Sequence, residues 1–514
     1  MNRVDAYVVV RETNPRGLPT LHREQLGGRP VLHWVCEALR RMETLRDIAV
    51  ICDRIDPFLE DLRKRYGVRL HDSTLPDNPR RARMRRCRLW SATGWRGGID
   101  YATAFDEDGW PEAFAAVQEA HPVDHVYHVG AEWPALDARL SDELVRHGIR
   151  MSADAHYIFH QAPPGFAGAL ISPRTVALMA GGRLLLRDAL AVNHKGEDNQ
   201  DEAKGTGNFE IPTALSRLSK RFTADTPRAL RWLELLRASD PGLVPGLGSW
   251  EDWSEAASKH PFPPGPPPEV EWEWVTPSGQ QVTPELFNRL SEELSSERDT
   301  LVTIDGRAPL TQHPDWVEMV RHLKARRIHG LHLRLGARDL SESVVTQLLS
   351  SPVDVISIRL DHEALSIPHT EQVERLCRGR NPQTGPLVVV EMVRRSELIA
   401  SWESFWDRWV PLADQVVWRP PMKALGLFPP GNDLVLTRAP RRPCRRLSAE
   451  TVIRADGTVA LCREDWEDRH ALGSVREESL ESIRRRQEAR WLRHAAGDWG
   501  TPCSSCDGWD SLAP

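Results

Sequence analysis

Four of the chain's eight cysteines lie close together near its end, at a spacing that could bind a metal. Cys503 and Cys506 form a C-x-x-C pair, whose two thiolates can hold one metal centre. The Asp-Gly pair at 456–457 is a strong signal for a two-residue β-hairpin turn. Such a hairpin would bring Cys444 and Cys462, which flank it, close together despite the gap between them. Four thiolates complete either a [4Fe–4S] cluster or a structural zinc site, so the pattern predicts a metal centre and leaves both metals open.

The rest of the composition is that of an ordinary globular protein. With 514 residues the chain is long enough for about three domains. A net charge of −6 indicates neither a nucleic-acid partner nor an anionic membrane. No stretch approaches the ~20 apolar residues of a membrane span, and the first residues lack a signal-peptide pattern. We therefore expect a cytoplasmic protein with reduced thiols, in which the scattered cysteines have no special role; these are Cys36, Cys52, Cys87 and Cys377.

The N-terminal part alternates strand-like and helix-like segments. The expected strands are 5–10, 48–52 and 124–129, and the expected helices are 30–41 and 137–147. Strands and helices in alternation predict an α/β fold with a parallel sheet and right-handed crossovers. A stretch rich in Pro and Gly follows at 239–268, and we interpret it as a linker between domains.

A second alternating series lies beyond that linker. Its expected strands are 270–275, 301–304, 330–335, 353–360, 387–393 and 415–418, separated by helical stretches such as 284–294, 316–326 and 341–349. Repeated βα units of this length build a complete or partial (β/α) barrel, and we expect a partial one. The predicted organisation is a first domain at 1–238, the linker at 239–268, the barrel at 269–430 and a small cysteine-bearing tail at 431–514.

The tail resembles the SPASM domain, the auxiliary-cluster domain at the C-terminus of many radical-SAM proteins. The residues that carry the resemblance are 443–444, the turn at 456–457, Cys462, 472–475, 479–480, Cys503 and Cys506. The full SPASM pattern has seven cysteines, so the four cysteines here imply at most one cluster. The resemblance implies one [4Fe–4S] cluster with all four cysteines as ligands and no open iron for a substrate, and zinc is the alternative.

The middle domain resembles a radical-SAM barrel that lacks its cofactor site. Enzymes of that family carry a C-x3-C-x2-C loop after the first barrel strand, and the corresponding residues here, 271–287, contain no cysteine. Residues 303–315 resemble the family's Gly-Gly-Glu-Pro strand, whose Glu meets the amino group of S-adenosylmethionine, but the motif reads Gly-Arg-Ala-Pro at 306–309. Residues 357–361 resemble a later Ser-Leu-Asp strand end. We expect no S-adenosylmethionine cluster and no autonomous radical-SAM activity; the alternative is an unrelated βα domain.

The front domain resembles sugar-nucleotide cytidylyltransferases of the spore-coat polysaccharide type, chiefly over 8–35. The resemblance implies a nucleotidyltransferase-like fold in which loop amides and basic side chains, among them Arg11 and Arg16, hold nucleotide phosphates. It places Glu132 and Glu210 where that family has metal-binding Asp residues. The implied ligands are a nucleotide or nucleotide-sugar with Mg²⁺ or Mn²⁺.

Two features of the front domain depart from that family. The lysine that follows the loop is missing, with Thr20 and Leu21 in its place, and the nearest basic residues are His22 and Arg23. Glu in place of Asp keeps the charge on a longer arm, and Mg²⁺ demands tight octahedral geometry at ~2.1 Å, so a looser Mn²⁺ site is the better match. The alternative for Glu132 is a solvated carboxylate that follows a strand.

The order of these three parts resembles the two-part family called spiro-SPASM, over nearly the whole chain. We hypothesise an iron–sulfur protein with a nucleotide-sugar-binding front domain, which acts as a scaffold or partner in making or modifying a glycan or natural product. One alternative is an active nucleotidyl- or glycosyltransferase. Another is an accessory electron-transfer or docking subunit of a cysteine-complete radical-SAM protein.

Overall fold

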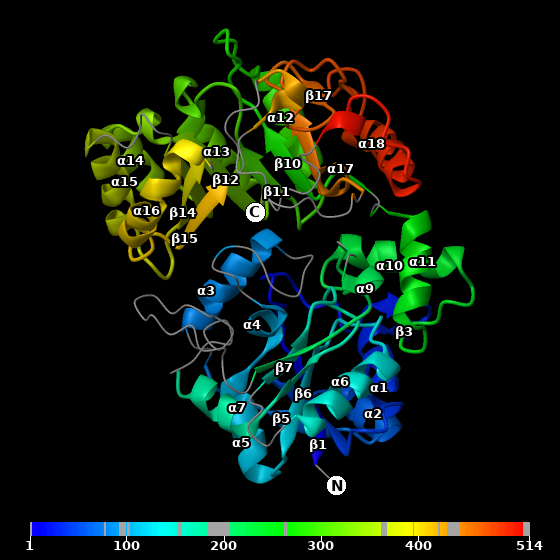
Figure 1. The fold of residues 1–514 in the computed structure, drawn as a ribbon. Coiled ribbons are helices and arrows are strands. Elements are labelled where there is room, and N and C mark those ends of the chain that lie inside the picture. The colour runs from blue at the N-terminus through cyan, green and yellow to red at the C-terminus, as the bar shows by residue number, and fades with distance from the viewer. Residues whose placement is uncertain are drawn as a thin grey trace. The chain divides into compact units, whose positions relative to one another are not determined.

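The computed structural model divides into two compact units, Met1–Pro263 and Pro264–Ala513, and each is described here by itself (Figure 1). The structure describes residues 3–76, 79–91, 99, 103–151, 157–182, 206–216, 218, 220–261, 263, 265–360, 367–393, 395–419, 422–428, 441 and 443–506. Over these residues, no helix is both long enough and apolar enough to cross a membrane.

The first unit is built on a seven-stranded sheet in the order β5-β4-β1-β6-β8-β7-β9. Its strands are β1 (Val4–Val10), β4 (Asp47–Cys52), β5 (Arg69–Asp72), β6 (His125–Gly130), β7 (Tyr157–His160), β8 (Ala169–Ile171) and β9 (Thr206–Phe209). The expected parallel arrangement is correct for β5, β4, β1 and β6 but wrong for β8, which runs antiparallel to both of its neighbours. The connection from β7 to β8 is too short for the crossover that parallel strands need.

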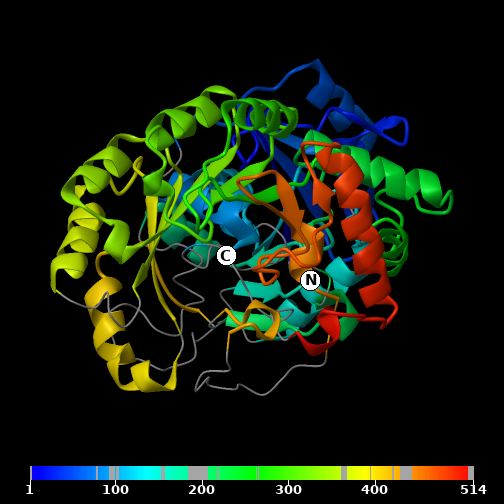
Figure 2. The same cartoon turned by 90° about the horizontal axis from the view of Figure 1, so that it is seen from above.

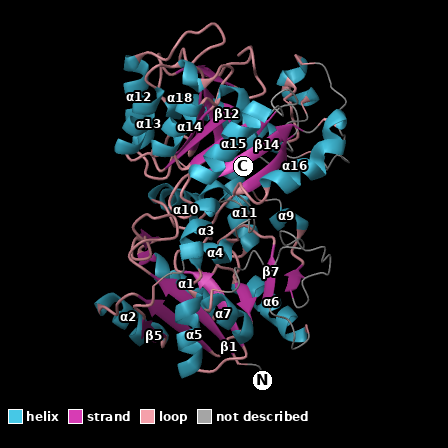
Figure 3. Ribbon diagram, turned by 90° about the vertical axis from the view of Figure 1, so that its left-hand side faces the viewer, coloured by secondary structure: helices cyan, strands magenta, loops and turns pink. Residues whose placement is uncertain are grey.

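Helices cover both faces of this sheet (Figure 3). Alternate residues of β1, such as Val8, pack with α1, α2 and α6, whereas Tyr7 packs with α5 and α7 on the other face. The helices of the unit are α1 (Val31–Arg40), α2 (Pro57–Tyr66), α3 (Pro79–Arg88), α4 (Ala104–Asp108), α5 (Pro111–Ala120), α6 (Ala138–Arg150), α7 (Pro173–Ala180), α9 (Thr213–Ser216), α10 (Pro227–Ser239) and α11 (Trp250–Lys259). This arrangement is the expected α/β class, and it explains why β1 and β4 are almost continuously apolar.

Most of the predicted linker belongs to the first unit. Helix α11 begins at a Ser249 capping box and buries Trp250, Trp253 and Ala256 in a core that it shares with α10. The boundary between the units falls at Pro263, not across 239–268. The sequence argument failed because the Pro and Gly residues on both sides of α11 hid the helical spacing of its apolar residues.

The second unit contains a nine-stranded sheet in the order β15-β14-β13-β12-β11-β10-β16-β17-β18. Its strands are β10 (Glu269–Trp272), β11 (Leu301–Ile304), β12 (Gly330–Gly336), β13 (Val355–Leu360), β14 (Leu387–Val393), β15 (Gln415–Arg419), β16 (Glu450–Ile453), β17 (Thr458–Ala460) and β18 (Gly473–Ser474). All neighbours from β15 to β16 are parallel. The two edges, β15 and β18, are different strands, so the βα units build an open sheet rather than a closed barrel.

Helices lie along the outer side of this curved sheet, as the green and yellow helices of Figure 2 show. They are α12 (Pro284–Ser295), α13 (Trp316–Ala325), α14 (Glu342–Ser350), α15 (Ile367–Gly379) and α16 (Trp402–Trp409), and the tail adds α17 (Arg445–Ala449) and α18 (Leu480–Ala495). One apolar core contains residues from β10 to β15 together with Ile453, Val459 and Ile483 of the tail. The barrel and tail that we expected as separate domains, 269–430 and 431–514, therefore share one sheet and one core.

Candidate functional site

The four C-terminal cysteines are positioned by the elements at the end of the second unit. The expected hairpin is present, because β16 and β17 are antiparallel with Val452 opposite Ala460. Cys444 directly precedes α17, and Cys462 lies two residues after β17. Cys503 begins a short 3-10 helix, and Cys506 follows it.

These four cysteines line one small cavity whose wall is almost entirely apolar. The other lining residues are Leu425, Arg441, Leu447, Leu461, His494 and Trp499. None of the cysteines is in a disulfide. Leu425 and the preceding Ala424 both have positive φ, at 55° and 47°, a strained backbone that is typical of functional sites. Two backbone N–H groups of this strained turn, at Lys423 and Ala424, donate to Glu464, which holds the turn against the tail.

Burial opposes ionisation of the thiols in this cavity. It raises the pKa of Cys462 well above its usual value, and Cys444 and Cys506 raise it further. Burial also raises the pKa of Cys444. A bound metal offsets this cost, because it stabilises the thiolate form of each ligand. Among the residues that the structure describes, no group of three or more His, Cys, Asp or Glu side chains is arranged to hold a single metal ion.

His494 is a further polar group in the cavity wall that the sequence argument missed. It lies on the buried face of α18, together with Leu480 and Gln487. Burial, followed by the charges of Arg490 and Arg441, lowers its pKa to about 4, and the backbone of Trp499 opposes this shift. The helical spacing of these residues was the available signal, since it places His494 on the apolar side.

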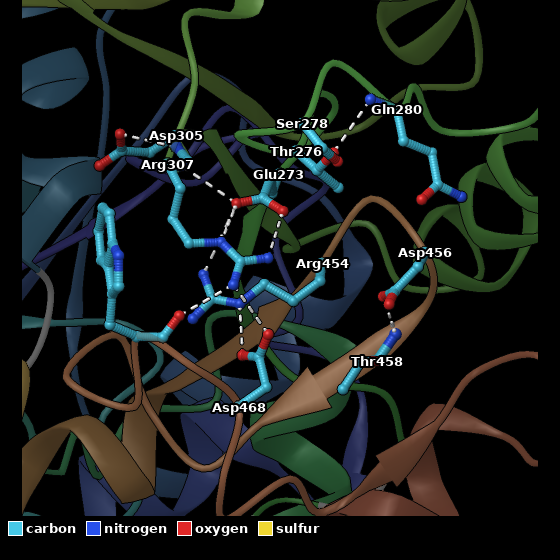
Figure 4. Close-up of polar contacts among 12 residues, drawn as sticks. Glu273, Thr276, Ser278, Gln280, Asp305, Arg307, Arg454, Asp456, Thr458 and Asp468 are labelled. Carbon is cyan, nitrogen blue, oxygen red and sulfur yellow. Dashed lines mark hydrogen bonds and ion pairs between the residues drawn. The ribbon is translucent and has the colours of Figure 1, made fainter.

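A buried ion-pair network joins the tail to the first strands of the second unit (Figure 4). Arg307 donates to both carboxylate oxygens of Glu273, at 2.8 and 2.9 Å, and to Asp468 at 3.0 Å. Asp468 also accepts from Arg454 at 2.7 Å. The Glu273 side chain is 1% exposed. Arg307, in the Gly-Arg-Ala-Pro segment at 306–309, is therefore engaged in holding the tail.

The segment that follows β10 is a closed turn. Thr276 N–H donates to the Gln280 carbonyl at 2.8 Å, and the Thr276 hydroxyl accepts from Gln280 N–H at 3.0 Å. Val275 and Gln281 form a β-bridge across the same turn, and Thr283 then caps α12. The residues between β10 and α12 thus form a tight hairpin, and residues 271–287 contain no cysteine.

In the first unit, the loop after β1 is held closed by Asn14. Its side-chain oxygen accepts from the N–H groups of Arg16 and Leu18 at 3.0 and 3.1 Å, and its amide donates to the carbonyl of Asp225 at 2.6 Å. The loop amides that were expected to hold phosphate are therefore used within the loop. A phosphate would have to be held here by basic side chains and a cation.

Glu132 lies next to this loop because β1 and β6 are neighbouring parallel strands whose carboxyl ends meet at one edge of the sheet. It is buried and accepts a hydrogen bond from Leu21 N–H. Burial raises the pKa of Glu132 well above its usual value, and the carboxylates of Asp225 and Asp108 raise it further. The alternative of a solvated carboxylate is therefore wrong, since only 5% of the residue is exposed.

Asp225, rather than Glu210, supplies the second acidic group next to Glu132. Burial alone would raise the pKa of Asp225, but Arg221 at 2.5 Å and Arg16 at 4.0 Å hold it below its usual value. Glu210 follows β9 and is exposed, and the acids with the largest effect on Glu132 do not include it. The signal available in the sequence was an acidic residue, Asp225, that directly precedes Thr226, the N-cap residue of α10.

The other basic residues near the loop have different roles. Arg11 lies 4.4 Å from the ring centroid of Trp110 and 3.4 Å from Asp53. His22 is buried, and burial lowers its pKa to about 4, so it is neutral at neutral pH and cannot replace a lysine. Arg23 pairs with Asp56 away from the two carboxylates. Of the predicted phosphate-binding residues, only Arg16 lies beside the Glu132–Asp225 pair.

Comparison with known proteins assigns the C-terminal part of the chain. Residues 444–507 match the model of the SPASM family, an iron-sulfur cluster-binding domain. An uncharacterized protein of Treponema pallidum (strain Nichols) is 32% identical over 117 residues, which are 23% of this chain and 33% of that protein. The chain therefore spans about a third of the length of this curated relative. The predicted SPASM resemblance is confirmed.

Several solved structures with similar folds each cover about half of the chain. A cytidylyltransferase from Leptospira borgpetersenii serovar Hardjo-bovis is 14% identical with a TM-score of 0.37, covering 51% of this chain and 96% of that one. A 4-diphosphocytidyl-2C-methyl-D-erythritol synthase from Anaerococcus prevotii is 10% identical with a TM-score of 0.28, covering 45% and 97%. BtrN in complex with AdoMet and 2-DOIA is 14% identical with a TM-score of 0.31, covering 47% and 92%.

Replacing Glu132 by Gln should stabilise the protein at neutral pH when no divalent cation is present. Because burial raises the pKa of Glu132 in the folded state, the wild type loses stability as pH rises from about 4.5, the usual value, through the folded pKa. The limiting slope for one group is ~1.4 kcal/mol per pH unit. Gln carries no charge and can still accept from Leu21 N–H. Denaturant unfolding in EDTA between pH 4 and 8 should give two curves that converge at low pH and separate as pH rises.

The matched control for that experiment is Glu210→Gln, because Glu210 is exposed and carries no such burial cost. Its stability should follow the wild type at every pH. Equal pH dependence for the Glu132 variant and the wild type would contradict the assignment of a buried, electrostatically destabilised carboxylate.

Proposed function

We propose that this chain is an iron–sulfur protein that holds one [4Fe–4S] cluster at Cys444, Cys462, Cys503 and Cys506. The observation that carries the proposal is that these four thiols, distant in sequence, line a single apolar cavity. The match to an iron-sulfur cluster-binding family over 444–507 supports the metal. When bound, such a cluster supplies one-electron transfer. The alternative occupant is a structural zinc ion.

The residues around the cavity fit a cluster that is held but not opened to substrate. Leu425, Leu447 and Leu461 exclude water from the thiols, and Arg441 donates to the carbonyls of Ser504 and Cys506. A guanidinium beside the site favours an anionic cluster with four thiolates. With all four irons bound by cysteine, the proposed role is electron transfer or structural organisation.

We further propose that the chain does not cleave S-adenosylmethionine by itself. The place of the missing cluster loop is a closed turn at 275–281, and the place of the acidic cofactor contact, beside Pro309, is Ala308. A methyl side chain there cannot accept a hydrogen bond from a cofactor ammonium group.

For the first unit we propose binding of a nucleotide or nucleotide-sugar together with a divalent cation. Glu132 and Asp225 would share the cation, and Arg16 would meet the phosphates. A cation beside Glu132 would offset the burial that raises the pKa of this carboxyl, and also the repulsion from Asp225 that raises it further. An active nucleotidyl- or glycosyltransferase is the second candidate, and this carboxylate pair is the observation that favours it. We favour a scaffold or partner role in glycan or natural-product modification, alone or beside a cysteine-complete radical-SAM protein.

Anaerobic reconstitution should yield about four irons and four sulfides per chain, with visible absorption near ~400 nm, since four thiolates complete one cluster. Replacing Cys503 and Cys506 together by Ala should abolish the colour. The matched control replaces Cys36 and Cys377, both buried elsewhere, and should keep it. Stoichiometric zinc without labile sulfide would overturn the iron–sulfur assignment and leave a metal site.

Incubation with S-adenosylmethionine and dithionite should give no 5′-deoxyadenosine beyond the amount formed by a Cys444→Ala variant. The control is needed because a reduced cluster can transfer electrons to the cofactor adventitiously. Product above that control would show that the chain is an autonomous radical-SAM enzyme. The measurement is chromatographic, on the reconstituted full chain.

CTP or a nucleotide-sugar with Mg²⁺ or Mn²⁺ should raise the melting temperature of the first unit. A ligand at a hundred times its dissociation constant adds ~2.7 kcal/mol. Arg16→Ala should remove much of the shift, whereas the matched control Arg23→Ala should keep it, because Arg23 pairs with Asp56 instead. Glu132→Ala should remove the dependence on the cation. Absence of a shift with every nucleotide and both metals would refute nucleotide binding and favour a scaffold.

A further inference from the structure

His494 has no assigned role, although it lies in the wall of the four-cysteine cavity. Only 2% of the residue is exposed. Neither of its ring nitrogens has a hydrogen-bond partner with acceptable geometry among the described residues. The backbone of Trp499 lies near the ring and partly opposes the lowering of the His494 pKa. A buried polar group without a partner requires an explanation, and a bound ligand is one of the few available.

The ring is held firmly where it is. It packs against the Trp499 indole, with centroids 4.9 Å apart, and the Arg441 guanidinium lies 4.5 Å from that same indole. Helix α18 is fixed to the sheet by Gln487, which donates to the Glu450 carbonyl at 2.6 Å and accepts from the Thr451 hydroxyl at 3.0 Å. The imidazole is therefore held in the cavity, away from hydrogen bonds with solvent.

The protein itself offers this imidazole few hydrogen-bonding partners in the cavity. A neutral or protonated imidazole carries at least one N–H, and the other residues that line this cavity are mostly leucines and cysteines. The thiolates and inorganic sulfides of a cluster are hydrogen-bond acceptors, and hydrogen bonds to these sulfurs are one of the factors that set a cluster's reduction potential. The orphaned donor and the proposed ligand therefore have complementary chemistry.

We propose that His494 donates a hydrogen bond from its ring to a sulfur atom of the cluster and thereby raises the cluster's reduction potential. The inference rests on the proposed function, since it requires an iron–sulfur cluster at the four cysteines. The reduced cluster carries one more negative charge than the oxidised one, so a donor stabilises the reduced form more. His494 is a positioning and tuning residue, and the four cysteines remain the ligands.

The test compares reduction potentials of the reconstituted full chain in which His494 is replaced by Phe or by Gln. Phe fills a similar volume without a donor, whereas Gln keeps an N–H group. The matched control is His470→Phe, a histidine of the same tail that does not line the cavity. Iron and sulfide content, melting temperature and the midpoint potential are measured for each variant.

His494→Phe should keep about four irons per chain and show a more negative potential. The loss of one hydrogen bond to a charged group corresponds to about tenfold less reduced cluster at a fixed potential, which is about 59 mV for a one-electron couple. His494→Gln should recover part of the shift, and the control should match the wild type. A cluster that is lost in the Phe variant but held by the Gln variant would also support a donor.

Two results would overturn the inference while leaving the proposed function intact. One is a Phe variant whose potential equals that of the control. The other is loss of the cluster in both variants while both still melt cooperatively, since His494 would then be an iron ligand rather than a donor. A wild-type chain that binds no iron after reconstitution would instead refute the proposed function, and the inference with it.

Discussion

The second unit depends on the pairing of β16 with β10. The strand after the βα series returns to lie parallel to its first strand, with Glu269 opposite Glu450 and Trp272 opposite Ile453, and the Glu273 N–H continues the ladder to the Ile453 carbonyl. The network at Asp468 lies at the end of this pairing, because Asp468 joins Arg454, which follows β16, to Arg307, which pairs with Glu273 directly after β10. Removing one member of such a buried pair would leave an uncompensated charge and costs about 3–5 kcal/mol.

The cysteine cavity is a consequence of this pairing. With β16 and β17 in the sheet, Cys462 is carried to a fixed strand end, and its neighbour Arg463 pairs with Glu271 and Glu450 on the polar face of the sheet. Cys444 is positioned by α17, which leads directly into β16. Gln487 anchors α18 on the same strand. Cys462 is thus the direct neighbour of an arginine that is paired inside the sheet, and the cysteine-bearing tail shares the sheet's core.

Short-range patterns predicted part of the elements, whereas contacts between distant residues were beyond them. Apolar runs gave β1, β4 and β6 of the first unit and β10 to β15 of the second to within a few residues, and the Asp-Gly signal gave the hairpin at 456–457. The short strands β5, β7, β8 and β9 were not predicted. The direction of β8, the membership of α11 and the choice of Asp225 over Glu210 all depend on how remote segments pack. His494 is a similar case. Its helical spacing indicates that it is buried, but the sequence does not show which groups surround it.

The front site is best understood from the cost of burying its two carboxylates. Glu132 receives a hydrogen bond from Leu21, and such a bond contributes only ~1 kcal/mol net to stability. Placing an ionised carboxylate in a buried position beside a second one costs several kcal/mol unless opposite charge is nearby. Arg221 and Arg16 are both directed at Asp225, so Glu132 is left with the larger share of the repulsion. A loop-holding role alone does not require this arrangement, because a neutral glutamine would hold Leu21 equally well. Two carboxylates beside one guanidinium instead suit a divalent cation and a phosphate attached to it, which is the site proposed above.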